Sequence, residues 1–175
     1  MFNTILKNKN SFLVIAITLI TAGCAMPQNA EEFRQFTRKS PFKSTDTYEV
    51  ARPLSEVSST LRKKTNECLA YTIKTTTTTD FVFKKTKTHT YKPTLITNPS
   101  RAELHLQLNR SEVIQVGAPP DGGYHVVLDA TPITKGRTRI DTYALSMATD
   151  DKVILMALKG WVTGDNLGCP DLISK

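Results

Sequence analysis

The segment Leu104-His105-Leu106-Gln107-Leu108 alternates between apolar and polar residues more strictly than any other part of the chain. Successive side chains of a strand point to opposite faces, so the three leucines share one face and His105 and Gln107 share the other. The segment therefore predicts a half-buried strand in a sheet that packs at least one face against a core.

Other segments extend this sheet along the chain. Runs rich in β-branched and aromatic residues occupy 47–51, 71–79, 81–91, 124–130 and 137–145, with a weaker candidate at 113–116. Lys135-Gly136 suits a tight hairpin turn, and Thr131-Pro132 predicts a bulge because proline cannot donate to the ladder. Short turns between consecutive strands predict an antiparallel sheet of five or six strands.

Two segments have helical spacing instead. The first begins at Pro53 and ends near Leu69; the second begins near Asp150 and ends at Gly164. Each carries an apolar stripe that needs a partner, so we predict an α+β domain with both amphipathic helices on one face of the sheet. This element order resembles the helix-grip arrangement of lipid-transfer and ligand-binding proteins. The resemblance implies a pocket for a lipid or small apolar ligand between the sheet and the C-terminal helix.

The N-terminus has a different pattern. Lys7 and Lys9 precede an apolar run at 12–20, which as a helix is about 14 Å long, against roughly 30 Å for a bilayer core. A basic start and a short apolar run are typical of a secretory signal peptide. The run ends in Thr21-Ala22-Gly23-Cys24, which resembles the lipobox of bacterial lipoproteins, with Thr21 in place of the usual leucine. The resemblance implies removal of residues 1–23 and lipidation of Cys24 with fatty acyl chains such as palmitate.

The same resemblance implies a location. Ala25 follows the cysteine, where an aspartate signals retention in the inner membrane, so the family pattern implies the outer membrane and a domain facing the periplasm. The body is similar to small uncharacterised proteobacterial outer-membrane lipoproteins, which brings no known activity. Residues 24–46 are polar with two prolines and predict a flexible tether, followed by a single domain at 47–175. The alternative is an ordinary signal peptide with a chance cysteine.

The charge of the chain indicates its partners. The formal net charge is +7, and removal of Lys7 and Lys9 with the leader lowers it to +5. The compartment argues against nucleic acid and favours an envelope protein or an anionic envelope component, such as lipid phosphates or peptidoglycan carboxylates. The basic residues that form the candidate anion-binding stretch are Lys84, Lys85, Lys87, Lys92 and Arg101. The alternative interpretation is a solvated edge strand whose lysines prevent aggregation.

Two further cysteines, Cys68 and Cys169, follow Cys24. Outside the cytosol such a pair favours a disulfide. The alternative, a redox or nucleophilic cysteine, lacks the Cys-x-x-Cys pattern that would support it.

Catalytic and metal-binding patterns are weak. His89, His105 and His125 lack metal-ligand spacing, and no Gly-x-Ser-x-Gly motif is present. With the turn at Lys135-Gly136, Asp129 is expected opposite Thr142 rather than Asp141, which argues against a carboxylate pair. We therefore predict no catalytic residue, metal or cofactor. The expected role is non-enzymatic, in interaction or envelope maintenance, with ligand binding as the alternative; the sequence specifies no oligomeric state.

Overall fold

The computed structural model describes residues 26–78, 84–111, 117–145, 149–165 and 168–172. The predicted signal peptide, Cys24 and the weak strand at 113–116 lie outside these residues. The described part is an α+β fold with a six-stranded antiparallel sheet and three helices. This confirms the predicted fold class and strand number. No helix in this part is long and apolar enough to cross a membrane.

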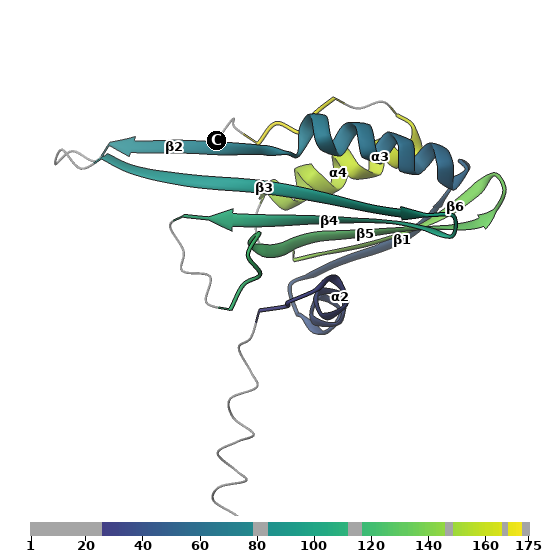
Figure 1. Cartoon of the computed structure of the whole chain (residues 1–175), viewed down its shortest axis with the longest axis horizontal. Coiled ribbons are helices and arrows are strands. Elements are labelled where there is room, and N and C mark those ends of the chain that lie inside the picture. Colours follow the sequence, from purple (N-terminus) through teal and green to yellow (C-terminus); the bar gives the residue numbers. More distant parts are fainter. Residues whose placement is uncertain (1–25, 79–83, 112–116, 146–148, 166–167, 173–175) are drawn as a thin grey trace, which may run out of the picture.

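Five consecutive strands form an antiparallel meander, and one long crossover through a helix connects the two edges of the open sheet. Along the chain the elements are α2 (Ala30–Lys39), β1 (Lys43–Val50), α3 (Leu54–Cys68), β2 (Tyr71–Thr78), β3 (Lys84–Asn98), β4 (Arg101–Arg110), β5 (Gly123–Thr134), β6 (Arg137–Leu145) and α4 (Thr149–Thr163). The strand order is β1-β6-β5-β4-β3-β2, so β1 and β2 form the two edges (Figure 1). β2 and β3 run beyond the rest of the sheet as a two-stranded arm.

Both faces of the sheet are covered. Leu104, Leu106 and Leu108 of β4 are buried in the main core with apolar side chains of α3 and α4. Val127 of β5 points the other way and joins a second cluster with Phe33 of α2. Figure 1 shows α3 and α4 on one side of the sheet and α2 on the other. The sequence predicted helices on one face only, and α2 was not foreseen.

α2 occupies the segment that was predicted to be a tether. Asn29 caps the helix by accepting a hydrogen bond from the Glu32 backbone nitrogen at 2.9 Å. Acidic residues lie in its first turn and Arg38 and Lys39 in its last, as the helix dipole favours. Phe33 is only 1% exposed against the sheet. The flexible tether predicted over 24–46 is therefore wrong for α2 and for the start of β1, because burial of one helix face outweighs the entropy of a free chain.

A disulfide joins Cys68, the last residue of α3, to Cys169 in the C-terminal segment, with 5.0 Å between the two Cα atoms. The predicted pairing is present. The bridge spans 101 residues, and a loop of that size stabilises the fold by roughly 4–5 kcal/mol in the chain-entropy model. Cys68 lies in the main core, so the bridge fastens the C-terminal segment to the end of α3.

The β5–β6 hairpin corrects one predicted register. The pairing shifts between Pro132 and Thr134, close to where a bulge was expected. This extra residue, Ile133, moves the register by one position, so Asp129 lies opposite Asp141 and Leu128 lies opposite Thr142. The prediction that Asp129 pairs with Thr142 is therefore wrong.

Candidate functional site

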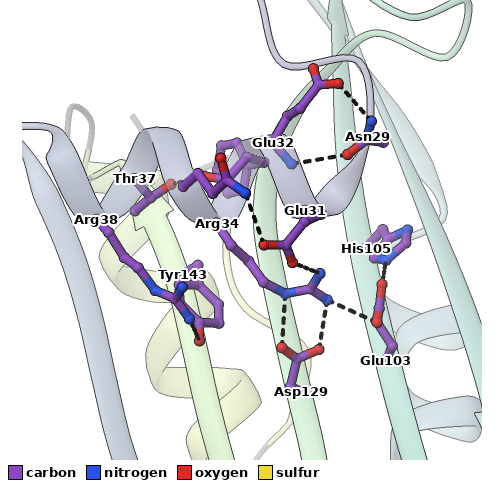
Figure 2. Close-up of polar contacts among 12 residues, drawn as sticks. Asn29, Glu31, Glu32, Arg34, Thr37, Arg38, Glu103, His105, Asp129 and Tyr143 are labelled. Carbon is purple, nitrogen blue, oxygen red and sulfur yellow. Dashed lines mark hydrogen bonds and ion pairs between the residues drawn. The ribbon is translucent and has the colours of Figure 1, made fainter.

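Charged side chains gather beneath α2, on the sheet face opposite the main core (Figure 2). We call this group, Arg34 from α2, Arg101, Glu103 and His105 from β4, and Asp129 from β5, the charge cluster. The side chains of Arg34, Asp129 and Glu103 are 7%, 10% and 16% exposed. Burial of this extent requires each charge to have a partner.

Arg34 is the centre of the charge cluster. Its Nε and Nη2 donate to the two carboxylate oxygens of Asp129, each at 2.8 Å. The same Nη2 lies 2.8 Å from Glu103 Oε2. A bidentate arginine–carboxylate pair is among the stronger polar contacts in proteins, because the planar guanidinium matches both oxygens. Arg34 therefore ties α2 to two strands at once.

The remaining members complete the charge balance. Arg101 Nη2 lies 2.5 Å from Glu103 Oε2 and 2.7 Å from Asp129 Oδ1. His105 Nε2 contacts the other oxygen of Glu103. Two guanidiniums thus face two buried carboxylates, so the charge cluster is close to neutral before any ligand binds.

Both Arg34 and Glu103 are held in their charged forms. Burial by itself raises the pKa of Glu103, but hydrogen bonds from His105 and Arg34 outweigh it and leave that pKa below its usual value. Burial lowers the pKa of Arg34, and the hydrogen bonds and charges of Asp129 and Glu103 more than reverse this effect. The charge cluster acts as a clamp between α2 and the sheet.

The two opposed aspartates have separate partners. Asp129 is held by Arg34 and Arg101. Asp141 accepts a hydrogen bond from Thr47 Oγ1 at 2.6 Å and another from Arg139 at 2.9 Å. Each of the two carboxylates therefore has its own set of donors.

The three histidines do not converge. His105 belongs to the charge cluster and meets Tyr124 edge-on, with 5.7 Å between ring centroids. His125 meets Tyr91, a main-core residue, at 5.9 Å and so lies on the other face of the sheet. His89 pairs with Arg110 where the arm begins. Within the described ranges, no three His, Cys, Asp or Glu side chains are placed to hold a metal ion.

The candidate anion-binding residues are spread along β3 and onto β4. Lys84 and Lys92 are eight residues apart on one strand, or about 26 Å at 3.3 Å per residue. Lys92 Nζ pairs with Asp121 at 2.5 Å, and Arg101 belongs to the charge cluster at the opposite end of β3. β3 is also an inner strand of the sheet, paired with β2 and β4, so the edge-strand interpretation applies to β2 instead.

A pocket of about 220 Å³ lies between the β1 edge of the sheet and α4. Its lining combines large apolar groups with charged groups and is made by Ser44, Asp46, Tyr48, Thr142, Lys152, Leu155, Met156 and Lys159. Lys159 Nζ lies 4.7 Å from the centre of the Tyr48 ring and 3.4 Å from Asp46 Oδ2. A depression of 270 Å³ at the start of α3 is lined mainly by small polar side chains, and one of 200 Å³ between α3 and the end of α4 is lined by Arg52, Thr60, Lys64, Trp161 and Gly164.

Tyr48, one of the residues that line the pocket, has an unsatisfied polar group. Its hydroxyl is buried and has no hydrogen-bond partner in the described part of the chain. Burial raises the pKa of Tyr48, and the nearby negative charge of Asp46 raises it further, so the hydroxyl keeps its proton. A protonated hydroxyl can donate a hydrogen bond to an acceptor on a ligand.

Arg34 and Glu103 were not singled out from the sequence. A signal for α2 exists in Asn29-Ala30-Glu31-Glu32, in which a capping residue is followed three positions later by glutamate. Asn29 Nδ2 does donate to Glu32 Oε1 at 2.7 Å. Nothing local to Arg34 identifies its partners, because Asp129 is 95 residues away along the chain.

Comparisons with known proteins leave the family open. No protein-family model matches the chain, and no curated protein does so. A conserved protein from Geobacillus kaustophilus has 15% identity and a TM-score of 0.36, over 70% of this chain and 93% of its own. Protein Ms6760 from Mycobacterium smegmatis has 9% identity and a TM-score of 0.34, over 73% and 91%. The di-domain ARO/CYC StfQ from the steffimycin biosynthetic pathway has 12% identity and a TM-score of 0.29, over 73% and 44%.

We predict that Arg34→Met destabilises the fold by about 3 kcal/mol, since it leaves two buried carboxylates short of a partner. The measurement is urea denaturation. Arg38→Met is the matched control, because Arg38 is exposed on the same helix and, within the described residues, contacts only Tyr143. Equal stability losses in the two variants would contradict the clamp.

We also predict acid sensitivity from Glu103. Its pKa is lower in the folded chain than in the unfolded chain, so the unfolded state takes up the proton first and stability rises with pH between the two values. The contribution is complete above the ordinary glutamate pKa of about 4.3 and is lost as pH falls through the lower folded value. Urea denaturation from pH 5 downward should show a weaker acid dependence in Glu103→Gln. Superimposable pH profiles would reject this role for Glu103.

Proposed function

We propose that the protein is a non-enzymatic, lipid-anchored binding protein of the outer membrane that faces the periplasm and takes a small ligand between β1 and α4. Thr21-Ala22-Gly23-Cys24, preceded by a basic and then an apolar segment, supports the anchor. The observation that carries the binding role is the pocket itself, with its apolar wall and the unpartnered Tyr48 hydroxyl. Such a combination is typical of sites for small organic molecules.

The volume of the pocket limits the size of the ligand, and its position shows where on the sheet the ligand would bind. Sites for drug-sized ligands usually measure roughly 300–1,000 Å³, so 220 Å³ suits a smaller molecule or one end of a longer one. In our proposal α3 and α4 on one face of the sheet form a helix-grip-like layout. The space between them and the sheet is filled by Ile154, Leu158 and Trp161, each at most 1% exposed. The binding site is therefore at the edge of the sheet and not in its centre.

The chemistry of the lining favours a ligand with an apolar body and one hydrogen-bond acceptor. Leu155 and the Tyr48 ring supply apolar surface, and Met156 at the rim is 69% exposed. A ligand that covers this methionine would remove apolar area from water. The Tyr48 hydroxyl would then find the acceptor that it lacks.

A protein partner in the envelope is the second candidate. Phe36 on α2 and Phe42 just before β1 are 47% and 60% exposed, on a protein whose other large aromatic side chains in the described part are mostly buried. Exposed aromatic groups are enriched where proteins meet each other. This role is compatible with a ligand in the pocket.

The anchor has a direct test. We predict that Cys24→Ser moves the protein from the membrane fraction to the soluble fraction, because no thiol is then available for lipid attachment. The paired variant Cys68→Ser/Cys169→Ser is the matched control and should stay with the membrane. Membrane association that survives the loss of Cys24 would overturn the anchor.

For the pocket we predict saturable binding of 6-propionyl-2-(dimethylamino)naphthalene, an apolar fluorophore with one carbonyl acceptor, whose fluorescence rises in apolar surroundings. Leu155→Trp should fill the pocket and weaken this binding at least about tenfold, the equivalent of roughly 1.4 kcal/mol. Ile133→Trp adds the same ring at an exposed apolar position on the distant β5–β6 turn and should leave binding unchanged. Binding that is lost equally in both variants, or absent from the original protein, would count against the proposal.

A further inference from the structure

The chain is already fixed to the domain within two residues of Cys24. The Met26 methyl carbon lies 2.8 Å from the position that a Cβ atom on Gly123 would occupy. Gln28 Nε2 donates to the Met26 carbonyl at 2.7 Å and also contacts the Gly117 carbonyl. These contacts attach the start of the described chain to the loop before β5 and to the first residue of that strand.

α2 continues this attachment without a gap. The Gln28 backbone nitrogen donates to Glu32 Oε2 at 2.8 Å, and Asn29 caps the helix from the next position. Ala30 is then buried in the second cluster. From Met26 onward, the segment predicted as a tether is therefore part of the folded domain, and only Ala25 separates it from Cys24.

The distance between the folded domain and a lipid on Cys24 would therefore be short. Two residue steps span at most about 8 Å, since consecutive Cα atoms are 3.8 Å apart. The twelve residues of β5 extend about 36 Å from Gly123 toward the β5–β6 turn. A lipid on Cys24 would thus hold the Gly123 end of the sheet, and not the turn end, at the bilayer surface.

The β2–β3 arm projects from that same end. Tyr91 pairs with Leu108, which pairs with Gly123, so β3 from Lys84 to Thr90 runs past the level of Gly123. Figure 1 shows the chain entering α2 on the sheet side away from α3 and α4, with the loop at 117–122 on that side as well. A membrane that meets Met26 without cutting through the arm must therefore run along the α2 side of the arm.

The charge of the arm matches an anionic surface. The arm, residues 71–78 and 84–91, includes four lysines and no aspartate or glutamate. Lys74 is exposed and alternates onto the α2 side of the sheet, whereas Lys87 alternates onto the other side. At the base of the arm Lys92 is on the α2 side and stays 55% exposed although it pairs with Asp121. The pair Thr72 and Thr90 lies between these two lysines, and the pair Thr76 and Thr86 lies farther out than Lys74; the hydroxyl oxygens of each pair are 3.2 Å apart. Lysines that lie near an anionic leaflet are attracted to it.

We propose that the α2 side of the β2–β3 arm lies along the bilayer, against acidic phospholipid headgroups, with the short Cys24 anchor setting this orientation. The inference rests on the lipid anchor proposed above and adds the face by which the domain meets the membrane. The anchor point, the direction in which the arm projects and the sign of its charge all favour this face.

The test uses the lipidated protein in vesicles of phosphatidylethanolamine and phosphatidylglycerol that contain a headgroup spin label. A fluorophore is attached at Thr76→Cys on the arm or, as the matched control, at Met156→Cys on α4, while Cys68 and Cys169 remain bridged. We expect strong loss of fluorescence at position 76 and little at position 156. A Gly-Ser insertion of about 20 residues between Ala25 and Met26, which reaches roughly 25 Å, should reduce this difference.

The outcomes separate the two proposals. If labelled protein fails to enter the vesicle fraction although it is folded, the anchor fails. If the protein is anchored but positions 76 and 156 are quenched equally, the anchor stands and the orientation is wrong. Lys74→Gln/Lys92→Gln should weaken quenching at position 76 without releasing the protein. Unchanged quenching in that variant would reject the role of acidic headgroups.

Discussion

The guanidinium of Arg34 is the contact on which the second face of the sheet depends. Without it, Glu103 and Asp129 would have to share Arg101 beneath a short helix with few apolar groups, and burial of incompletely paired charge costs several kcal/mol. With it, α2 is joined to β4 and β5 by geometry that a lysine could not reproduce. The apolar contact of Phe33 then adds to a helix that is already positioned.

The placement of α2 determines how closely the proposed lipid anchor at Cys24 would hold the domain. A domain on a flexible tether of about 20 residues could move over roughly 25 Å and present any face to the membrane. A domain whose fold begins at Met26 has one fixed exit point, beside Gly117 and Gly123. The clamp beneath α2 and the attachment at Met26 are consecutive parts of one segment, so in the anchored form that we propose the packing of α2 would also set the orientation of the domain at the membrane.

The two candidate sites differ because their charges are satisfied to different degrees. In the charge cluster each carboxylate has two or more donors and both arginines are engaged, so the group stabilises the fold. At the pocket, the buried hydroxyl of Tyr48 has no partner among the described residues, and Lys159 Nζ is 3.4 Å from Asp46 Oδ2. Unused hydrogen-bonding capacity beside apolar surface is what a ligand can exploit, which is why the more strongly charged group is the weaker candidate for binding.

The sequence by itself determined the elements whose pattern is local: the β4 strand through its alternating leucines, and α3 and α4 through their apolar stripes. The pairing of Cys68 with Cys169 was expected from the lipoprotein resemblance, which implies an oxidising compartment. Only the tertiary structure decided the rest. α2 has a charged composition that local patterns assign to solvent, and the partners that bury Arg34 lie far along the chain. The bulge at Ile133 shifted a register by one residue, which no local pattern specifies. The candidate anion-binding lysines are close together in the sequence but far apart along β3, because each residue of an extended strand adds more than 3 Å to its length.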